Sequence, residues 1–325
     1  MDILQLLLKK WVVPKFNINN SSNDQELKYN LSLIYTCLKN MNFTTIKNAF
    51  MERVEDLEYD FTPDALTSGA ICFFGSMLMS LAQLGYIKNI EELFTLASLY
   101  MILDHYIDDI NISDLEKAKT ISEIKKVIKN PDLDINIIEK GIIRQISKRY
   151  ISLITKIPSA EPHLKALFKS EVDSMYLQKD NNLDISEYYR INEEKGGLTC
   201  CAIQSILELE VTEEEYKLGA CIQLVDNVLD LDDDIHDNIN TEVTHYIANF
   251  ASLNHIFTYN LYKIYNLSNK YNLMKPVLIM GLLFSMDLHK EYVTPKLLEL
   301  LEPFMWLKNI SKDEIRDIIW LFLVD

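Results

Sequence analysis

One segment of the chain concentrates carboxylates at a spacing that could bind a metal ion. Asp226, Asp230 and Asp234 stand four residues apart within residues 223–237, so on a helix they share one face. Like charges at this spacing destabilise an isolated helix by roughly 0.2–0.5 kcal/mol per pair, and Asp is also a poor helix former. A cation would offset both penalties, and carboxylate oxygens are the ligands that Mg²⁺ prefers. We therefore expect these three carboxylates to be magnesium ligands.

Three other interpretations of this segment are open. Charge alone is equally typical of a solvated acidic helix end. An EF-hand loop starting at Asp230 would need Gly at its sixth position and Glu at its twelfth, but Ile235 and Thr241 stand there. His236 and Asp237 resemble the dyad of a metal phosphohydrolase, although no matching array of histidines exists. The spacing therefore favours a metal site more than it favours any of these.

A second group of carboxylates ends an otherwise apolar helix. Asp104 and Asp108 stand one helical turn apart, and Asp109 follows at the edge of the helix. Taken alone, this group is as typical of a solvent boundary as of a site. Two acidic groups, each with an i, i+4 Asp pair on a helix, are a rarer combination. Together they predict two facing walls of one metal site.

Between the two acidic groups lies a lysine that is followed by two glycines. Lys195 precedes Gly196 and Gly197, and the whole chain contains only 8 glycines, so we expect the helix to be interrupted here. An ammonium beside a helix break can reach a phosphate that freed backbone N–H groups also contact. On its own, this feature is more typical of an ordinary exposed lysine at a turn.

The elements that must position these residues are predicted to be helices. Gly and Pro each occur only 8 times in 325 residues, which favours long helices over many short strands joined by turns. Residues 1–25 are expected to form an N-terminal arm, and residues 26–325 a single all-α domain. The expected helices are 25–58, 65–84, 89–110, 134–156, 161–179, 184–207, 212–236, 241–272, 276–290, 294–307 and 311–323.

Composition excludes several classes of protein. The net charge of −16 disfavours nucleic acid as a partner, because phosphate backbones are bound by basic surfaces. The apolar run at residues 276–286 is too short to span a bilayer, and the N-terminal residues do not resemble a signal peptide. The 5 cysteines lack metal-binding spacing, which fits a reduced, cytoplasmic setting, with Cys200 and Cys201 as small core residues. The sequence allows a homodimer.

The acidic groups and the lysine together resemble the class I isoprenoid synthase superfamily, which comprises prenyl diphosphate synthases and terpene synthases. The first family motif is Asp-Asp-x-x-Asp, and Asp104-His-Tyr-Ile-Asp108 keeps its first and last residues, with His105 in between. The stretch from Glu187 to Lys195-Gly-Gly-Leu is similar to the family's Tyr-x₆-Lys segment, whose lysine binds diphosphate. The resemblance implies a helical bundle with a central active-site cavity.

The second family motif takes two forms, and this chain resembles both. Gln223-Leu-Val-Asp226-Asn-Val-Leu-Asp230 is similar to the motif of chain-elongating synthases, whereas Asp226, Asp230 and Asp234 fit the 1, 5, 9 spacing of terpene cyclases. Elongation needs a second diphosphate substrate, which family members bind with basic residues in two further segments. The corresponding residues 67–72 and 111–115 contain no Lys or Arg. A terpene synthase is therefore expected, with a prenyl diphosphate synthase and a non-catalytic helical relative as alternatives.

The resemblance also implies a mechanism and a set of site residues. The two acidic groups would bind about three Mg²⁺ ions, for which Mn²⁺ can substitute, and these ions would stabilise the leaving diphosphate of a prenyl substrate. Farnesyl diphosphate is the default substrate. Lys195 and Arg190 would add donors, and Lys290 and Tyr292 could replace the C-terminal Arg-Tyr pair of the cyclases. The candidates for lining an apolar cation cavity, each also typical of core packing, are Phe73, Phe74, Tyr100 and Cys201.

Overall fold

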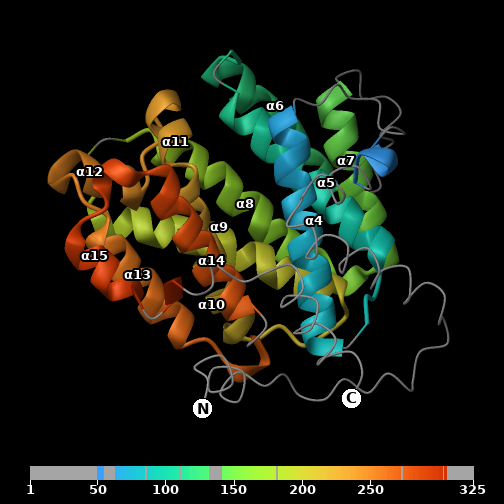
Figure 1. The fold of residues 1–325 in the computed structure, drawn as a ribbon. Helices are drawn as coiled ribbons and strands as arrows, with labels where there is room; N and C mark the ends of the chain where they lie inside the picture. The colour runs from blue at the N-terminus through green and yellow to red at the C-terminus, as the bar shows by residue number, and fades with distance from the viewer. Residues whose placement is uncertain are drawn as a thin grey trace. The chain divides into compact units, whose positions relative to one another are not determined.

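The computed structural model describes residues 50–54, 63–84, 86–109, 111–131, 141–180, 182–271, 274–302 and 304–305. Every regular element in these ranges is a helix, and they contain no strand (Figure 1). The prediction of an all-α protein is thereby confirmed for this part of the chain. The expected N-terminal arm at 1–25, most of the expected helix at 25–58 and the expected helix at 311–323 lie outside the described residues.

The chain divides into two compact units, and the division falls inside two of its helices. Among the described residues, unit 1 includes Tyr176–Cys200 and the chain from Thr212 onward, whereas unit 2 includes the chain from Phe50 to Met175 and the short segment Cys201–Val211. Helices α8 (Glu161–Leu177) and α9 (Ile185–Ile206) each contribute residues to both units. The single domain expected for residues 26–325 stays a prediction.

Unit 2 is built from four helices that pack on one another around an apolar interior. They are α4 (Pro63–Leu84), α5 (Ile90–Asp108), α6 (Asp114–Lys129) and α7 (Gly141–Lys156), followed by the 3₁₀ turn η3 (Pro158–Ala160) and α8. Helix α5 packs against α4 and α7, and α6 packs against α7 (Figure 1). Because α5 lies between α4 and α7, it is buried along nearly its whole length, which agrees with its almost continuous apolar sequence.

The central helix of unit 1 is α10 (Glu213–Leu229), which packs against two later helices. The elements that follow α10 are α11 (Leu231–Asp237), α12 (Glu242–Phe250), α13 (Asn254–Tyr265), η4 (Asn269–Tyr271), α14 (Met274–Leu288), η5 (Lys290–Tyr292) and α15 (Pro295–Leu301). Helix α10 contacts α13 and α14, and α13 also contacts α15. The second acidic segment therefore begins on the central helix of unit 1.

The helix boundaries differ from the predicted ones in several places, among them α15, which ends at Leu301 instead of residue 307. The expected helix at 212–236 is divided at Asp230, and the expected helix at 241–272 ends early at Ala251, whose φ of 46° closes α12 in the left-handed region. Helix α6 was not among the predicted helices, although Ser113 caps its N-terminus by accepting a hydrogen bond from the Glu116 N–H. Ile121, Ile124 and Ile128 recur at helical spacing and are buried, so the sequence carried a signal for this helix.

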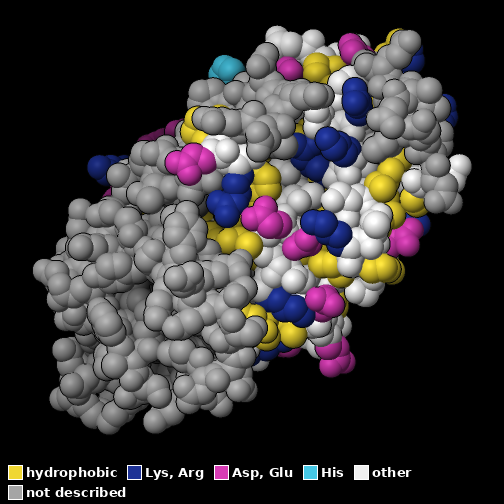
Figure 2. Space-filling view, turned by 90° about the vertical axis from the view of Figure 1, so that its right-hand side faces the viewer, with side chains coloured by type: hydrophobic (Ala, Val, Ile, Leu, Met, Phe, Trp, Pro, Cys, Tyr) yellow, Lys and Arg dark blue, Asp and Glu magenta, His cyan; other side chains and the backbone are white. Residues whose placement is uncertain are grey.

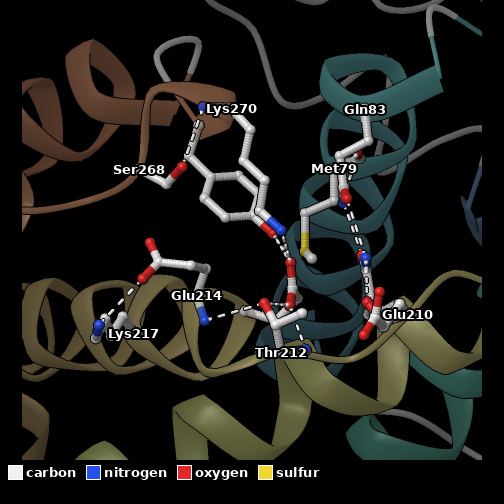
Figure 3. Close-up of polar contacts among 11 residues, drawn as sticks. Met79, Gln83, Glu210, Thr212, Glu214, Lys217, Ser268 and Lys270 are labelled. Carbon is white, nitrogen blue, oxygen red and sulfur yellow. Dashed lines mark hydrogen bonds and ion pairs between the residues drawn. The ribbon is translucent and has the colours of Figure 1, made fainter.

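The start of α10 is held by a fully buried carboxylate (Figure 3). Glu215 Oε2 accepts a hydrogen bond of 2.7 Å from the Thr212 backbone N–H, and Glu215 Oε1 accepts from the Lys270 ammonium and the Tyr271 hydroxyl. Burial opposes ionisation of Glu215, but the hydrogen bonds from Lys270, Thr212 and Tyr271 outweigh it and lower the pKa. Glu215 therefore joins η4 to α10 as an ionised, fully satisfied group.

Unit 2 has its own buried polar contact, drawn in the same view (Figure 3). The side-chain amides of Gln83 on α4 and Gln204 near the end of α9 bond each other reciprocally at 2.7 and 3.0 Å. Gln204 also donates to the Glu210 carbonyl at 3.0 Å. The segment that follows α9 is therefore fixed to α4 by amide pairing.

The surface carries charges of both signs. In the described part of the face shown in Figure 2, Lys and Arg side chains are interspersed with Asp and Glu side chains and with apolar side chains. Among the described residues, no helix is both long enough and apolar enough to cross a membrane.

Candidate functional site

The second acidic group lies on a nearly continuous helical path through α10 and α11. The Asp230 N–H donates to the Asp226 carbonyl at 2.9 Å, and the Asp234 N–H donates to the Asp230 carbonyl at 2.8 Å. These i to i−4 bonds continue the helical winding although Asp230 itself separates the two helices. The three carboxylates therefore stand one turn apart, with Asp226 and Asp234 half-buried and Asp230 exposed.

Asp226 is held by a polar network. Gln223 donates its side-chain amide to Asp226 Oδ2 at 3.4 Å and to Asn227 Oδ1 at 2.9 Å. Asn227 in turn donates to both oxygens of Glu242 at 3.1 and 3.2 Å. Asn192 on α9 donates to the same carboxyl at 2.6 Å.

Glu242, the first residue of α12, is fully buried. Burial raises its pKa to about 7, although the hydrogen bonds from Asn192 and Asn227 act in the opposite direction. Two amide donors therefore offset only part of the desolvation of the carboxylate. This contrasts with Glu215, which has an ammonium among its partners.

Lys195 lies on α9 at the point where this helix approaches α10 most closely. A Cβ added to Gly196 would lie 2.2 Å from the Gly219 carbonyl oxygen and 2.6 Å from Gln223 Cβ. A Cβ added to Gly219 would lie 2.0 Å from the Gly196 carbonyl oxygen. The two backbones therefore touch at this pair of glycines, and Lys195, only 9% exposed, precedes the contact directly.

The expected interruption of the helix at Gly196 and Gly197 is wrong. Helix α9 runs unbroken from Ile185 to Ile206, so its backbone N–H groups at the glycines are not freed for a ligand. The glycines instead remove side chains where α10 approaches: a Cβ on Gly197 would meet the Tyr216 ring at 2.6 Å. Glycine thus serves close helix packing here, a use that composition cannot distinguish from helix breaking.

The other predicted substrate-binding residues of unit 1 lie at exposed or partly exposed positions. Arg190 is exposed, and its guanidinium already donates to Glu187 and Glu194 on the same helix, at 2.9 Å in each case. Lys290 is exposed, and Tyr292, at the other end of η5, is half-buried. The residue before them, His289, is buried, and its Nδ1 lies 3.6 Å from Asp232 Oδ1.

The first acidic group lies at the C-terminal end of α5 in unit 2. Asp104 is half-buried, Asp108 is exposed and is the last residue of the helix, and Asp109 is its C-cap. Asp109 Oδ1 accepts hydrogen bonds from the backbone and side-chain N–H groups of Asn111, at 2.8 and 3.1 Å. That the two acidic groups face each other stays a prediction, because they belong to different units.

The predicted apolar lining residues are all in unit 2 and are mostly core residues. Phe73 is fully buried, and its ring centroid lies 6.0 Å from that of Phe50 and 5.9 Å from that of Phe94. Phe74 and Cys201 are buried as well. Cys200 and Cys201 are both buried in the interior, as expected for small core residues.

Tyr100, a predicted lining residue, borders a small cavity within unit 2. The cavity has a volume of about 20 Å³ and is also lined by Leu103, Phe168 and the buried Glu171. Pockets that hold small molecules typically measure about 300–1,000 Å³. The cavity within this unit is therefore of the size of a water molecule and does not by itself hold a prenyl chain.

The donor set of the second acidic group fits magnesium. Its oxygen donors are carboxylates, and Mg²⁺ usually takes only one or two of these from a protein and completes its shell with water and substrate phosphates. Within the described ranges, no three His, Cys, Asp or Glu side chains are arranged to hold a metal ion by themselves. Magnesium binding by Asp226, Asp230 and Asp234 therefore stays a prediction, in which a phosphate ligand would complete the shell of the ion.

Sequence reasoning missed the amide and carboxyl residues that surround Asp226. Asn227 lies inside the motif but does not fall on the i, i+4 series, and Glu242 follows the Thr241 N-cap, where an exposed acid is common. Nothing in the sequence indicates that α12 buries this acid against α9 and α10. Only the tertiary contacts bring Asn192, Asn227 and Glu242 together.

No known protein family, curated protein or solved structure matches the chain.

Proposed function

We propose that the chain is a magnesium-dependent class I terpene synthase, which ionises a prenyl diphosphate and cyclises or quenches the resulting cation. The observation that carries the proposal is the Gly196–Gly219 contact, which places Lys195 beside the helix that carries Asp226 within one compact unit. A buried lysine on the helix that packs against the one carrying these carboxylates suits a ligand that is itself anionic and brings cations with it. Farnesyl diphosphate is the default substrate, and a cytoplasmic location and a homodimer belong to the same proposal.

The carboxylates of both acidic groups would hold the metal ions, namely Asp104, Asp108, Asp109, Asp226, Asp230 and Asp234. When bound, Mg²⁺ supplies positive charge that stabilises the diphosphate as it leaves. Lys195 would donate hydrogen bonds to a diphosphate oxygen and add to this stabilisation. Its burial strengthens such a bond, because water competes less for the ammonium.

In the proposed reaction the allylic carbon–oxygen bond breaks heterolytically, and the electron pair leaves with the diphosphate. The allylic cation that remains, or the cyclic cation formed when it reacts with a double bond of its own chain, is then quenched by loss of a proton to give a hydrocarbon, or by addition of water with loss of a proton to give an alcohol. A class I helical bundle would carry this out in a central apolar cavity that excludes water. Tyr100 and Phe74 are the aromatic side chains we assign to that cavity, in addition to their packing roles.

A prenyl diphosphate synthase is the second candidate, because the segment from Gln223 to Asp230 resembles the elongating enzymes as closely as it resembles the cyclases. The absence of Lys and Arg from residues 67–72 and 111–115 argues against it, since a second diphosphate would need basic partners there. A non-catalytic helical relative is the third candidate.

The decisive experiment is incubation of the purified chain with MgCl₂ and farnesyl diphosphate, followed by analysis of volatile products and of released diphosphate. We expect a hydrocarbon or an alcohol without added isopentenyl diphosphate. Asp226→Ala is expected to reduce the rate by about 100-fold or more. Asp233→Ala is the matched control, because Asp233 is an exposed carboxylate on α11 outside the i, i+4 series, and it should leave the rate unchanged.

The same assay separates the candidates. A longer diphosphate that forms only when isopentenyl diphosphate is added would establish the elongating synthase instead. No Mg²⁺-dependent release of diphosphate under either condition would favour the non-catalytic relative. Unchanged activity in Asp226→Ala would refute the site assignment even if the chain is an active enzyme.

A further inference from the structure

Unit 1 contains a chain of side-chain hydrogen bonds that starts at a buried carboxyl and ends at the first member of the acidic series. Glu242 is 0% exposed, and its partners Asn192 and Asn227 are also buried. Burying a carboxyl group is costly unless its oxygens accept hydrogen bonds. Even with these hydrogen bonds, burial raises the pKa of Glu242 to about 7, so the bonds offset only part of the cost of burying the charge. This remaining cost suggests that Glu242 has a role beyond stability.

The direction of each hydrogen bond follows from the chemistry of the groups. Above pH 7, where Glu242 is ionised, its carboxylate only accepts, so both asparagines turn their NH₂ groups toward it. The Asn227 carbonyl oxygen is then left to accept from the Gln223 NH₂ at 2.9 Å. Gln223 thereby presents the same NH₂ group to Asp226 Oδ2 at 3.4 Å, the longest contact of the chain.

The far side of Glu242 is fixed in the same manner. Gln178 donates to Asn192 Oδ1 at 2.9 Å, and the Gln178 carbonyl accepts from the backbone and side-chain N–H groups of Asn240 at 2.9 and 2.8 Å. Asn240 lies two residues before Glu242. The carboxyl is therefore held from both sides, and the amide side chains on the Asp226 side have one orientation.

We infer that Glu242 is a positioning residue for the metal site: through Asn227 and Gln223 it fixes the Asp226 carboxylate in the orientation that binds magnesium and diphosphate. The inference rests on the proposed function, since it assigns a role to residues behind the proposed metal ligands. Groups that hydrogen-bond a metal ligand fix its orientation and basicity, and removing one typically weakens metal binding by about 10- to 100-fold.

Glu242→Gln tests the inference with a minimal change of shape. Asn192 contacts only Oε2 of Glu242, whereas Asn227 contacts both oxygens. The new NH₂ can avoid Asn192 but must face the NH₂ of Asn227. The Asn227 amide then turns over, Gln223 turns with it, and a carbonyl oxygen instead of an NH₂ group faces Asp226.

The measurement is isothermal titration calorimetry of the full chain with MgCl₂ in the presence of inorganic diphosphate, at a pH above 7 and well below the unfolding temperature. We expect Glu242→Gln to bind Mg²⁺ about 10-fold or more weakly than the wild type. Asn227→Ala removes the middle of the chain and is expected to weaken binding similarly. It keeps the test decisive if Glu242→Gln does not fold.

Glu215→Gln is the matched control. Glu215 is an equally buried, hydrogen-bonded carboxylate of the same unit, but its partners are Thr212, Lys270 and Tyr271. It should lower the unfolding temperature and leave the affinity for Mg²⁺ and diphosphate unchanged. Weakened binding in this control as well would show that general destabilisation is responsible, and would overturn the positioning role.

The outcomes also distinguish this inference from the proposed function. If the wild type binds Mg²⁺ with diphosphate and Glu242→Gln binds it equally well, the positioning role is overturned and the proposed function stands. If the wild type shows no such binding, the proposed function fails and the positioning role fails with it.

Discussion

Two fully buried carboxyl groups in unit 1 show how the partner decides the charge of a buried acid. Glu215 accepts from an ammonium and a hydroxyl, and these bonds outweigh burial and lower its pKa. Glu242 accepts only from amides, and burial raises its pKa to about 7. Amide donors stabilise an anion less than a cation does. The same residue type is therefore a fixed anchor in one place and a titrating group in the other.

The raised pKa of Glu242 predicts a pH-dependent contribution to stability. As the pH rises from 4.5 to about 7, the unfolded chain releases the Glu242 proton while the folded chain keeps it, so the free energy of unfolding falls. One unit of pKa corresponds to about 1.4 kcal/mol, so the shift from 4.5 to about 7 corresponds to about 3 kcal/mol. Above pH 7 this contribution no longer changes.

Urea unfolding of the wild type and of Glu242→Gln across pH 5 to 8 measures this contribution of Glu242 to the free energy of unfolding. We expect the stability of the wild type relative to the variant to fall by about 2.5 kcal/mol over this range, because part of the full change lies below pH 5. The comparison with the variant removes the contributions of other groups, among them Glu215, whose lowered pKa acts in the opposite direction. A constant difference between the two proteins would mean that Glu242 is ionised throughout.

At the scale of elements, α9 and α10 are in direct backbone contact at one pair of glycines. The pair Gly196 and Gly219 leaves no room for a Cβ on either helix. Close approach of this kind fixes the relative placement of the residues that flank it, here Lys195 and Gln223. The geometry of the candidate site in unit 1 therefore depends on two residues that carry no functional group.

Gly196→Ala is expected to destabilise the chain by about 1–3 kcal/mol or more, because the added methyl would overlap the Gly219 carbonyl and Gln223 and force the helices apart. The matched control is Gly75→Ala within α4, where an added Cβ meets no atom within 4 Å. This control should be neutral or stabilising by up to about 1 kcal/mol, through helix propensity. Thermal unfolding of both variants measures the difference, and equal stability would show that α9 can shift without cost.

At the scale of the whole molecule, the sequence predicted the helical class and the acidic face for sound physical reasons. Few glycines and prolines leave long helices as the main option, and a spacing of four residues places Asp226, Asp230 and Asp234 on one face even though Asp230 divides the helix. Gly196 led to the wrong prediction of a helix break, because a helix break and the close packing of two helices both use glycine. The burial of Glu242 depends on contacts between helices, which local patterns do not encode.

The net charge of −16 predicts how the whole chain responds to salt. Repulsion among excess carboxylates destabilises the compact state, and salt screens it. Raising NaCl from about 20 mM to about 200 mM, which shortens the screening length to below about 10 Å, should raise the unfolding temperature by a few degrees. KCl should act equally if screening is the cause. An unchanged or lower unfolding temperature would mean that the opposite charges are already well paired.

The contact between α9 and α10 also limits how this chain can change over evolution. A substitution at Gly196 or Gly219 cannot be accommodated by a smaller neighbour, because the neighbouring atom is a backbone oxygen. A larger residue at either position would require the two helices to separate, and this would move Lys195 and Asp226 with them. Distant relatives that retain the site should therefore share this glycine pair even where their surrounding sequences have diverged. The pair can then serve as a marker of common descent.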